Sequence, residues 1–428
     1  MKYLVLGCGL SGLGACEFLR WRGDETYIYD DSPFKEQSLL VLAELQVLIV
    51  TSLEHPIFQD IDLTLVLSPG IPSDHKIIAG IWARGRTPII LSELELALPT
   101  YSGKIIAVTG TNGKSTTVMM ITHLFQQLGL RAAAAGNVGV SVSSLLTKTP
   151  HPDFLVVEVS SYQLEHSTAI KPDIAIFTSF SHDHIARHKT LENYFLSKWK
   201  LFQWQKKGSL ALFASSVVEI LPRFGVSTIE LHAKVELVEA HKFAEFGKRI
   251  GLSSHNLLNA SFAVESLTFL TGKPIHLLFE KLENFKTLPF RFEKIGLLHR
   301  KEVINDSKST NVDSTLRALE NIEGTCILFL GGLGKKESFT PISQFKDRIS
   351  SIVAFGQDAE KIKSELSPLI PVDSYPSLKA FTAELPLKIN GFHDKILFSP
   401  ACASLDEFLN FEDRGSFFNR SITPFLDK

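Results

Sequence analysis

A strand-like run that ends in a glycine-rich loop constrains this chain more than any other feature. Apolar residues at 104–108 lead into Thr-Gly-Thr-Asn-Gly-Lys-Ser-Thr at 109–116, and an amphipathic helical pattern follows. Glycines in such a loop let backbone N–H groups close around phosphate oxygens, and the helix N-terminus favours an anion. Lys114 adds a positive charge, and the hydroxyl of Ser115 or Thr116 can bind Mg²⁺. The stretch predicts a nucleoside triphosphate site in a shortened phosphate loop.

Composition narrows the class of protein. With 428 residues and 44% hydrophobic content, the chain can form two or three domains with cores of their own. A net charge of −2 gives no basic field for nucleic acid or anionic membrane, so we expect small-molecule partners and a monomer. The four cysteines show no zinc or C-x-x-C spacing, and the first residues show neither a secretory signal nor a membrane span. A cytoplasmic protein is expected.

Apolar runs alternate with helical patterns along the whole chain, which predicts α/β domains with parallel sheets. We predict three domains: a Rossmann-like domain at 1–91, a central P-loop ATPase-like domain at 92–287 and a Rossmann-like domain at 288–428. The strands expected in them lie at 3–6, 26–29, 63–67, 87–90, 104–108, 154–157, 174–177, 303–304, 326–330, 352–355 and 395–398. Residues 209–250 show no regular pattern.

A second glycine loop lies at the start of the chain. Gly-Cys-Gly-Leu-Ser-Gly at 7–12 follows a strand and opens a helix, with Asp30 and Asp31 about twenty residues later. This fingerprint suits NAD, but the same turn suits any diphosphate, and the acid suits any ribose. Because a triphosphate loop stands elsewhere in the chain, we favour a UDP-sugar. Ser-Pro-Gly-Ile at 68–71, with Gly70, would form the other lip of the crevice.

Two polar side chains follow neighbouring predicted strands. Glu158 ends the strand at 154–157, and His184 lies just beyond the strand at 174–177. Phosphoryl transfer needs metal ions near the phosphate loop, and the carboxyl ends of parallel strands are where such groups gather. We therefore predict both as metal ligands.

Further motifs carry a family resemblance. Besides the phosphate loop they are Gly-Asn-Val-Gly at 136–139, Glu-x-Ser-Ser-Tyr-Gln-Leu-Glu at 158–165, Asp-His at 183–184, His-Asn-Leu-Leu-Asn at 255–259, Asn-Asp-Ser-Lys-Ser-Thr-Asn at 305–311, Ser-Pro-Ala-Cys-Ala-Ser at 399–404 and Asn-Phe-Glu-Asp-Arg-Gly at 410–415. In this order, over essentially the whole chain, they resemble the Mur ligases, and the 158–165 and C-terminal motifs resemble the D-glutamate-adding branch.

The resemblance implies an ATP-dependent ligase of the acid:amino-acid type. Such an enzyme would add D-glutamate to UDP-N-acetylmuramoyl-L-alanine through an acyl phosphate, in the synthesis of peptidoglycan precursors for the cell wall, and so serve cell shape, cell division and the cell cycle. It would use ATP, two Mg²⁺ ions and a CO₂-derived carbamate on Lys198. From the sequence alone, Lys198 would otherwise be an exposed helical lysine.

The resemblance also assigns residues. The catalytic residues would be Lys114, His184 and Lys198, and the metal ligands would be Ser115, Glu158, His184 and Lys198. ATP would be bound by Gly110, Thr111, Asn112, Gly113, Lys114, Ser115, Thr116, Asn259, Arg291 and Asp306. The UDP-sugar would be bound by Leu10, Ser11, Asp30, Gly70 and Asn137, and D-glutamate by Thr310, Lys335, Ser404 and Phe411.

Several positions depart from the family pattern: Ser179 stands for an asparagine, Ala186 and Leu333 for acids, Phe290 for the histidine before Arg291, and Asp31-Ser32 for Thr-Arg. The last departure changes how the uracil or diphosphate is held. A sister Mur or folylpolyglutamate-type ligase is the main alternative. An NAD-dependent dehydrogenase, resting on the first glycine loop, and a non-enzymatic nucleotide switch are weaker ones.

Overall fold

The computed structural model describes residues 1–60, 62–165, 167, 170–250, 252, 254–335, 337–388, 391 and 394–427. The chain divides into two compact units. The first unit comprises residues 1–180 and 187–285, and the second comprises 181–186 and 286–428. The three domain boundaries drawn from the sequence stay a prediction.

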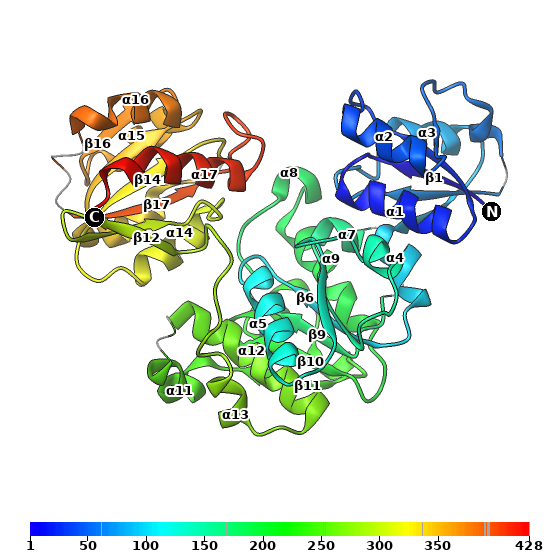
Figure 1. The fold of residues 1–428 in the computed structure, drawn as a ribbon, viewed down its shortest axis with the longest axis horizontal. Coiled ribbons are helices and arrows are strands. Elements are labelled where there is room, and N and C mark those ends of the chain that lie inside the picture. Colours follow the sequence, from blue (N-terminus) through cyan, green and yellow to red (C-terminus); the bar gives the residue numbers. More distant parts are fainter. Residues whose placement is uncertain are drawn as a thin grey trace. The chain divides into compact units, whose positions relative to one another are not determined.

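The first unit begins with a five-stranded parallel sheet of order β3-β2-β1-β4-β5. Its strand β1 lies among helices α1, α2 and α3 (Figure 1). Its elements are β1 (Lys2–Leu6), α1 (Leu10–Trp21), β2 (Glu25–Tyr29), α2 (Glu36–Glu44), β3 (Leu48–Ile49), β4 (Leu63–Leu67), α3 (Lys76–Ala83), β5 (Ile89–Ser92) and α4 (Glu93–Ala97). Alternate β1 residues face opposite sides: Leu4 and Leu6 pack with α3, and Tyr3 and Val5 pack with α1 and α2. Both faces are therefore covered, as the long apolar strands require.

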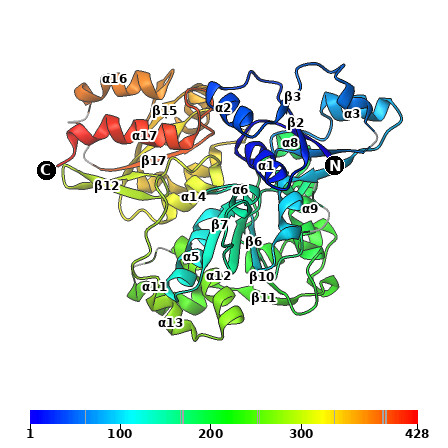
Figure 2. The ribbon, with the colours of Figure 1, turned by 45° about the vertical axis from the view of Figure 1, so that its right-hand side comes forward.

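A second sheet of the same unit has six parallel strands in the order β11-β10-β9-β6-β8-β7. Helices α5 and α12 pack against each other beside it (Figure 2). Its elements are β6 (Lys104–Thr109), α5 (Lys114–Gln127), β7 (Ala132–Gly136), α6 (Val142–Leu146), β8 (Phe154–Glu158), α7 (Ser161–Glu165), β9 (Ile174–Phe177), α8 (Ile185–His188), α9 (Leu191–Gln203), β10 (Leu210–Ala214), α10 (Ser215–Val218), β11 (Lys234–Val238), α11 (Ala244–Arg249), α12 (Ser254–Thr271) and α13 (Ile275–Glu280).

The second unit holds a six-stranded sheet of order β12-β13-β17-β14-β15-β16. Its elements are β12 (Glu293–Leu298), β13 (Lys301–Asn305), α14 (Val312–Glu320), β14 (Cys326–Gly331), β15 (Ile349–Phe355), α15 (Ala359–Leu366), β16 (Val372–Tyr375), α16 (Leu378–Lys388), β17 (Lys395–Ala401) and α17 (Phe411–Ile422). Separate apolar clusters fill its two faces, one with α14 and α15 and the other with α16 and α17. Unlike the parallel pairs, the edge strand β12 runs antiparallel to β13, because only a two-residue turn joins them.

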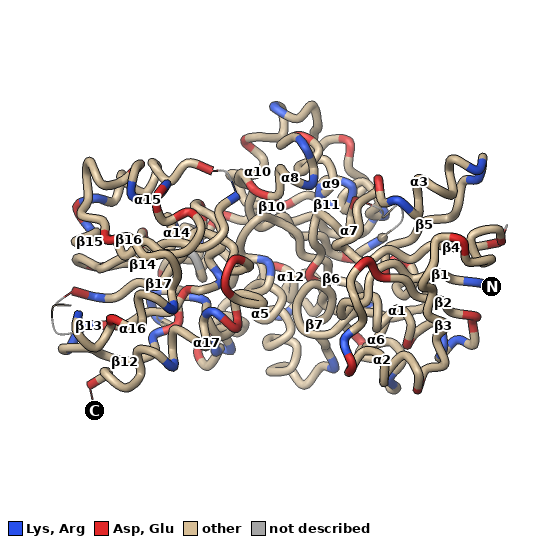
Figure 3. Tube along the Cα trace, turned by 90° about the horizontal axis from the view of Figure 1, so that it is seen from above, with Lys and Arg blue, Asp and Glu red and all other residues tan. Residues whose placement is uncertain are grey.

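The predicted α/β class is thus confirmed, with two parallel sheets in the first unit, whereas the sheet of the second unit is mixed because its edge strand β12 is antiparallel. Residues with positive and negative side chains are interspersed along both units (Figure 3). Within the described part of the chain, every helix is too short or too polar to cross a bilayer.

Candidate functional site

The phosphate loop has the strand-loop-helix form that the sequence predicts. Strand β6 ends at Thr109, and α5 begins at Lys114. Gly110 and Gly113 adopt φ values of +147° and +86°. A Cβ at Gly110 would lie 2.1 Å from Oγ1 of Thr178, and one at Gly113 would lie 2.6 Å from Oδ1 of Asn259. Both positions therefore require glycine for the backbone angle and for space.

Side chains from the neighbouring strand end hold this loop in shape. The hydroxyls of Thr178 and Ser179 donate to the Asn112 carbonyl at 2.6 and 3.0 Å, and the Thr111 N–H donates to the Ser179 carbonyl at 2.8 Å. Ser179, a departure from the family pattern, thus acts as a clamp on the loop. Asn259, predicted to contact the nucleotide, accepts a hydrogen bond from Thr117 at 3.2 Å and lies directly under the loop.

Two lysines converge on one oxygen of the loop. Nζ of Lys114 donates to the Gly110 carbonyl at 3.0 Å and to the Thr111 carbonyl at 2.8 Å, and Nζ of Lys198 donates to the same Gly110 oxygen at 2.8 Å. Lys198 is only 1% exposed, and its ammonium lies 4.7 Å over the Tyr194 ring. The alternative of an exposed helical lysine is therefore wrong. Paired ammonium groups at the N-terminus of α5 favour a highly charged anion.

Glu158 lies at the end of β8, next to the strand that leads into the phosphate loop. Its side chain is buried, and Oε1 accepts a hydrogen bond from Nδ2 of Asn137 at 2.9 Å. Residue pairing in the sheet sets Glu158 opposite Val108 of β6. Within the described residues, no three His, Cys, Asp or Glu side chains form a cluster that could hold a metal alone. A cation at Glu158 would therefore need further ligands, such as the phosphate oxygens of a bound nucleotide.

The first glycine loop borders a pocket of about 500 Å³. The pocket brings together all five residues predicted for the UDP-sugar, namely Leu10, Ser11, Asp30, Gly70 and Asn137; its other lining residues are Gly7, Cys8, Gly9, Asp31, Ser32, Ser68, Pro69, Ile71 and Gly136. Gly12 is essential to the turn, because a Cβ there would lie 1.8 Å from the Gly7 carbonyl oxygen. The lip at 68–71 faces the glycine loop, as expected.

Asp30 has a structural role that the sequence did not predict. Its Oδ2 accepts the Cys8 N–H at 2.6 Å, and its Oδ1 accepts the Ser32 N–H at 2.8 Å. Both oxygens thus tie the glycine loop to the turn after β2. Ser68 donates to the Gly7 carbonyl at 3.0 Å and fixes the opposite lip to the same loop.

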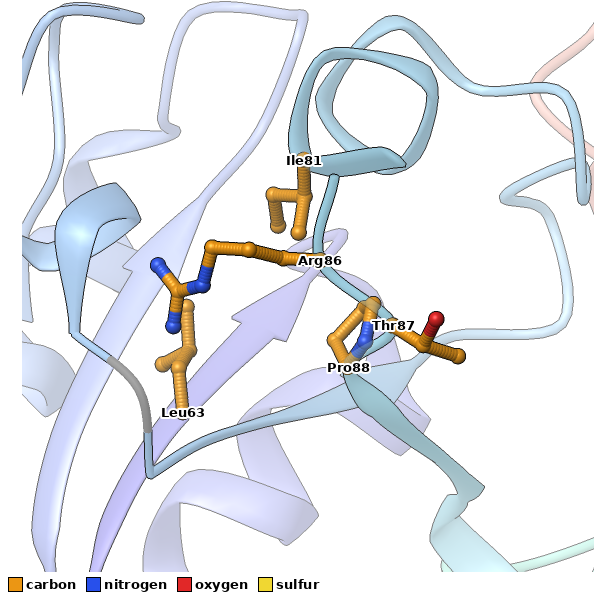
Figure 4. A pocket seen from close by; sticks show the side chains of 5 residues that line it. All are labelled: Leu63, Ile81, Arg86, Thr87 and Pro88. Atoms are coloured by element: carbon orange, nitrogen blue, oxygen red, sulfur yellow. The ribbon is translucent and has the colours of Figure 1, made fainter. Parts of the chain in front are cut away.

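A smaller cavity of about 190 Å³ lies at the other end of the first sheet. In Figure 4 the Arg86 side chain crosses it between Ile81 and Leu63. The guanidinium donates to the carbonyls of Phe58 (2.9 Å) and Asp60. This cavity is a packing feature that ties the 56–60 segment to α3.

In the second unit, an ion pair joins the Asp-His motif at 183–184 to Lys335, a predicted amino-acid contact. Nζ of Lys335 lies 2.6 Å from Oδ1 of Asp183, whose Oδ2 accepts from Nδ2 of Asn311 at 3.1 Å. Although burial raises it, the charge of Lys335 brings the pKa of Asp183 down to about 2. The next residue, His184, has a φ of +56° and is partly exposed, with Nε2 3.6 Å from Oδ2 of Asp183. The arrangement thus brings Lys335, a predicted amino-acid contact, and His184 to the same carboxylate.

Asp306 is a buried carboxyl at the end of β13. It accepts hydrogen bonds from Ser309 (2.5 Å), Ser399 (2.9 Å) and the Phe292 N–H (3.0 Å). Burial raises its pKa to about 6, because removal from water disfavours the charged form. Nearby, the guanidinium of Arg291 lies 5.8 Å over the Phe411 ring. Arg291, predicted to contact the nucleotide, therefore lies next to Phe411, predicted to contact the amino acid.

Comparison with known proteins identifies the family. Residues 108–264 match the Mur ligase middle domain. The chain is 34% identical to UDP-N-acetylmuramoylalanine–D-glutamate ligase of Hydrogenobaculum sp. (strain Y04AAS1), over 99% of this chain and 98% of that protein. It is 33% identical to the ligase of the same name from Aquifex aeolicus (strain VF5), with the same coverage.

The chain belongs to the Mur ligase family. These full-length relatives put it in the branch of the D-glutamate ligases. The fold agrees: the structure of UDP-N-acetylmuramate–alanine ligase MurC from Thermotoga maritima matches with a TM-score of 0.58 at 17% identity, over 99% of each chain.

One functional candidate in this Mur ligase was missed at the sequence level. Arg414 of α17 is fully buried, and burial lowers its pKa to about 10. It donates to the carbonyls of Ser307 (2.8 Å), Cys402 (3.0 Å) and Gly331 (3.4 Å), and Nε donates to Oγ of Ser307 at 3.1 Å. It thereby joins the segments that follow β13, β14 and β17. The Arg-Gly pair of the C-terminal motif was the available signal, but its contacts are all distant in sequence.

The predicted site residues are divided between the two units. Those of the phosphate loop, Asn259, Glu158, Lys198 and the UDP-sugar pocket lie in the first unit; His184, Arg291, Asp306, Thr310, Lys335, Ser404 and Phe411 lie in the second. Ser404 is buried just beyond β17, and Thr310 is partly exposed just before α14. Their individual roles stay predictions.

Proposed function

We propose that this Mur ligase uses ATP to join D-glutamate to UDP-N-acetylmuramoyl-L-alanine, in the synthesis of peptidoglycan precursors. The observation that carries the proposal is the similarity to D-glutamate ligases along 99% of the chain, which includes all three sheets. A nicotinamide-dependent dehydrogenase would leave the phosphate loop with its two lysines unexplained.

The proposed reaction has two chemical steps. An oxygen of the substrate carboxylate attacks the γ-phosphorus of ATP, the bond to ADP breaks, and an acyl phosphate forms. The amine of D-glutamate then attacks the acyl carbon, loses a proton, and expels phosphate as the amide bond forms. Both steps develop negative charge on oxygens that positioned donors can stabilise.

Residues of the first unit would bind and orient ATP. Backbone N–H groups at 113–116 and the ammonium of Lys114 would hold the phosphates, while Thr178 and Ser179 keep the loop rigid. Lys114 would turn from the Gly110 carbonyl toward the γ-phosphate. Mg²⁺, held by Ser115 and Glu158, would neutralise phosphate charge when bound.

Lys198 is proposed to carry a carbamate that serves as a further metal ligand. The fit rests on position: the amine is buried beside the phosphate loop and next to a second ammonium, where a positive charge is unfavourable. Conversion to an anionic group would remove that repulsion. His184 is proposed to act with it, and Lys335, Thr310, Ser404 and Phe411 to hold D-glutamate, with the lysine paired to a substrate carboxylate. We place the reaction in the cytoplasm.

The proposal is tested by phosphate release from Mg-ATP with different acceptors. Release should require both D-glutamate and UDP-N-acetylmuramoyl-L-alanine, and omission of either should reduce it to background. Release with dihydropteroate and L-glutamate instead would move the protein to the folylpolyglutamate-type ligases. ATP hydrolysis that ignores every acceptor would contradict a ligase.

A further inference from the structure

The pocket beside the first glycine loop has an unusual charge balance for a nucleotide site. Its lining includes two carboxylates, Asp30 and Asp31, while none of its fourteen lining residues carries a lysine, arginine or histidine side chain. The N-terminus of α1 offers only a partial positive charge. Backbone N–H groups of the glycine loop and this helix N-terminus can hold a diphosphate. A cation just outside the lining would add a full positive charge to offset the two carboxylates.

Such a cation stands at the margin of the pocket. Nζ of Lys76, the first residue of α3, lies 2.6 Å from Oδ1 of Asp31 and 5.5 Å over the Tyr29 ring. A hydrogen bond from Lys76, then one from His75, lowers the pKa of Asp31, and the same contact with Asp31 raises the pKa of Lys76. Both groups are therefore charged at neutral pH.

Asp31 is held in place by neighbouring side chains, and it keeps a carboxylate within reach of the Lys76 ammonium. Nδ1 of His75 accepts the Ile77 N–H at 3.3 Å, which leaves the proton on Nε2 to be donated to Oδ2 of Asp31 at 2.9 Å. Tyr29 donates to Oδ1 of Asp31 at 3.0 Å. His75 is buried, whereas the Lys76 side chain is 53% exposed. An ammonium has three donors, so Lys76 can keep its bond to Asp31 and still bind an incoming anion.

We infer that Lys76, held at the pocket by Asp31 and His75, supplies the positive charge that binds the diphosphate of the nucleotide substrate. This inference rests on the proposed function, in which the pocket takes a UDP-sugar. It also accounts for one departure from the family pattern, because an acid at Asp31 in place of a Thr-Arg pair would otherwise add repulsion. In this chain the cation comes from α3, and Asp31 is its anchor.

The test is calorimetric binding of UDP and of uridine to the full-length protein and to Lys76→Ala. The matched control is Arg84→Ala, which removes an exposed cation from the other end of the same helix. One lost charge-assisted contact should weaken UDP binding about tenfold in Lys76→Ala, with uridine binding unchanged. Arg84→Ala should bind UDP as the wild type does. Raising the salt concentration should narrow the gap between wild type and Lys76→Ala.

The possible outcomes distinguish a failure of this inference from a failure of the proposed function on which it rests. If Lys76→Ala binds UDP as tightly as the wild type, or loses uridine equally, the role of Lys76 is overturned. If the wild type binds no UDP at all, the proposed UDP-sugar pocket fails as well. Weakened UDP binding confined to Lys76→Ala supports both.

Discussion

The phosphate loop of the first unit is built differently from the proposed amino-acid region of the second, which comprises Thr310, Lys335, Ser404 and Phe411. The loop is one contiguous stretch between β6 and α5, clamped by Thr178 and Ser179 from the adjoining strand end. The amino-acid region is assembled from segments that follow β13, β14 and β17, which Arg414 of α17 joins through backbone carbonyls. The first region is thus defined by local sequence, and the second by long-range contacts.

This difference affects how each region should respond to substitution. In the phosphate loop, side chains that touch substrate can be removed while the clamp keeps the backbone in place. In the amino-acid region, the groups that shape the site are also buried structural groups. Loss of function there should come together with loss of stability, whereas in the phosphate loop the two should separate.

The largest effect is expected at the two lysines that share the Gly110 carbonyl. Lys198→Ala and Lys114→Ala should each lower kcat/KM by about a thousandfold or more, because each removes a charge that the phosphoryl transfer requires. Thermal unfolding should change little in Lys114→Ala, since that side chain is not fully buried. Lys200→Ala, from the same helix as Lys198, is the control and should remain active. Near-normal turnover in Lys114→Ala or Lys198→Ala would contradict the proposed role of that lysine in phosphoryl transfer.

The next effect concerns Arg414. Arg414→Met leaves buried carbonyls without donors, so the free energy of unfolding should fall by about 3 kcal/mol. The KM for D-glutamate should rise about tenfold, and the KM for ATP should change less. Arg420→Met replaces an exposed arginine of the same helix and should leave both quantities unchanged. Wild-type stability and D-glutamate KM in Arg414→Met would show that the region does not depend on this side chain.

A pH-dependent effect is expected at Asp306. Its folded-state pKa of about 6 exceeds the ordinary value of 3.8, so the native state holds a proton that the unfolded chain has lost. The stability that this proton contributes is fully present below pH 3.8 and is lost as pH rises toward 6. The unfolding free energy of the wild type, measured relative to Asp306→Asn, should therefore drop by about 3 kcal/mol over that range. A constant difference, or one that grows with pH, would contradict a buried protonated carboxyl.

The smallest effect is expected at the lip of the UDP-sugar pocket. Arg187 donates to Glu165 at 2.9 Å and to the Ile71 carbonyl at 2.5 Å, and Ser73 donates to Glu165 at 2.8 Å. Arg187→Met should raise the KM for UDP-N-acetylmuramoyl-L-alanine about threefold, with the KM for D-glutamate unchanged, because only the lip loosens. Steady-state kinetics with Arg131→Met as the exposed-arginine control would check this. Equal changes in both KM values would show that the lip does not act specifically on binding of UDP-N-acetylmuramoyl-L-alanine.

Much of the fold could be predicted from apolar runs that end in loops. The strands expected at 3–6, 63–67, 154–157 and 326–330 fall within β1, β4, β8 and β14, and the run at 87–90 is shifted by two residues from β5. Strand β7 was missed because Ala132–Gly136 is mostly alanine, which favours helices; pairing with β8 determines its conformation. Strands β10 and β11 were also missed, because both lie in the stretch at 209–250, where the pattern of apolar residues is less regular.

The site could be predicted only where its residues are close in sequence or stand at a strand end. The glycines of both loops were recognised in this way, and the five residues that the family resemblance assigns to the UDP-sugar line one pocket, although their role stays a prediction. The burial of Lys198 could not be predicted, because a lysine in a helix is ordinarily exposed, and only tertiary packing shows that this one is buried together with Phe195 and Trp199. Asp30 and Arg414 anchor other segments through hydrogen bonds with backbone N–H and carbonyl groups. The pattern of side chains along the sequence does not show which backbone groups lie next to them.

The most direct test of the central claim is the amino-acid preference of the purified enzyme. With Mg-ATP and UDP-N-acetylmuramoyl-L-alanine, product would be measured by mass spectrometry for D-glutamate, L-glutamate, glycine, L-alanine, L-lysine and meso-diaminopimelate in one panel. The proposed function predicts an amide product with D-glutamate alone. A product with another amino acid, and none with D-glutamate, would contradict it and move the chain to a sister branch.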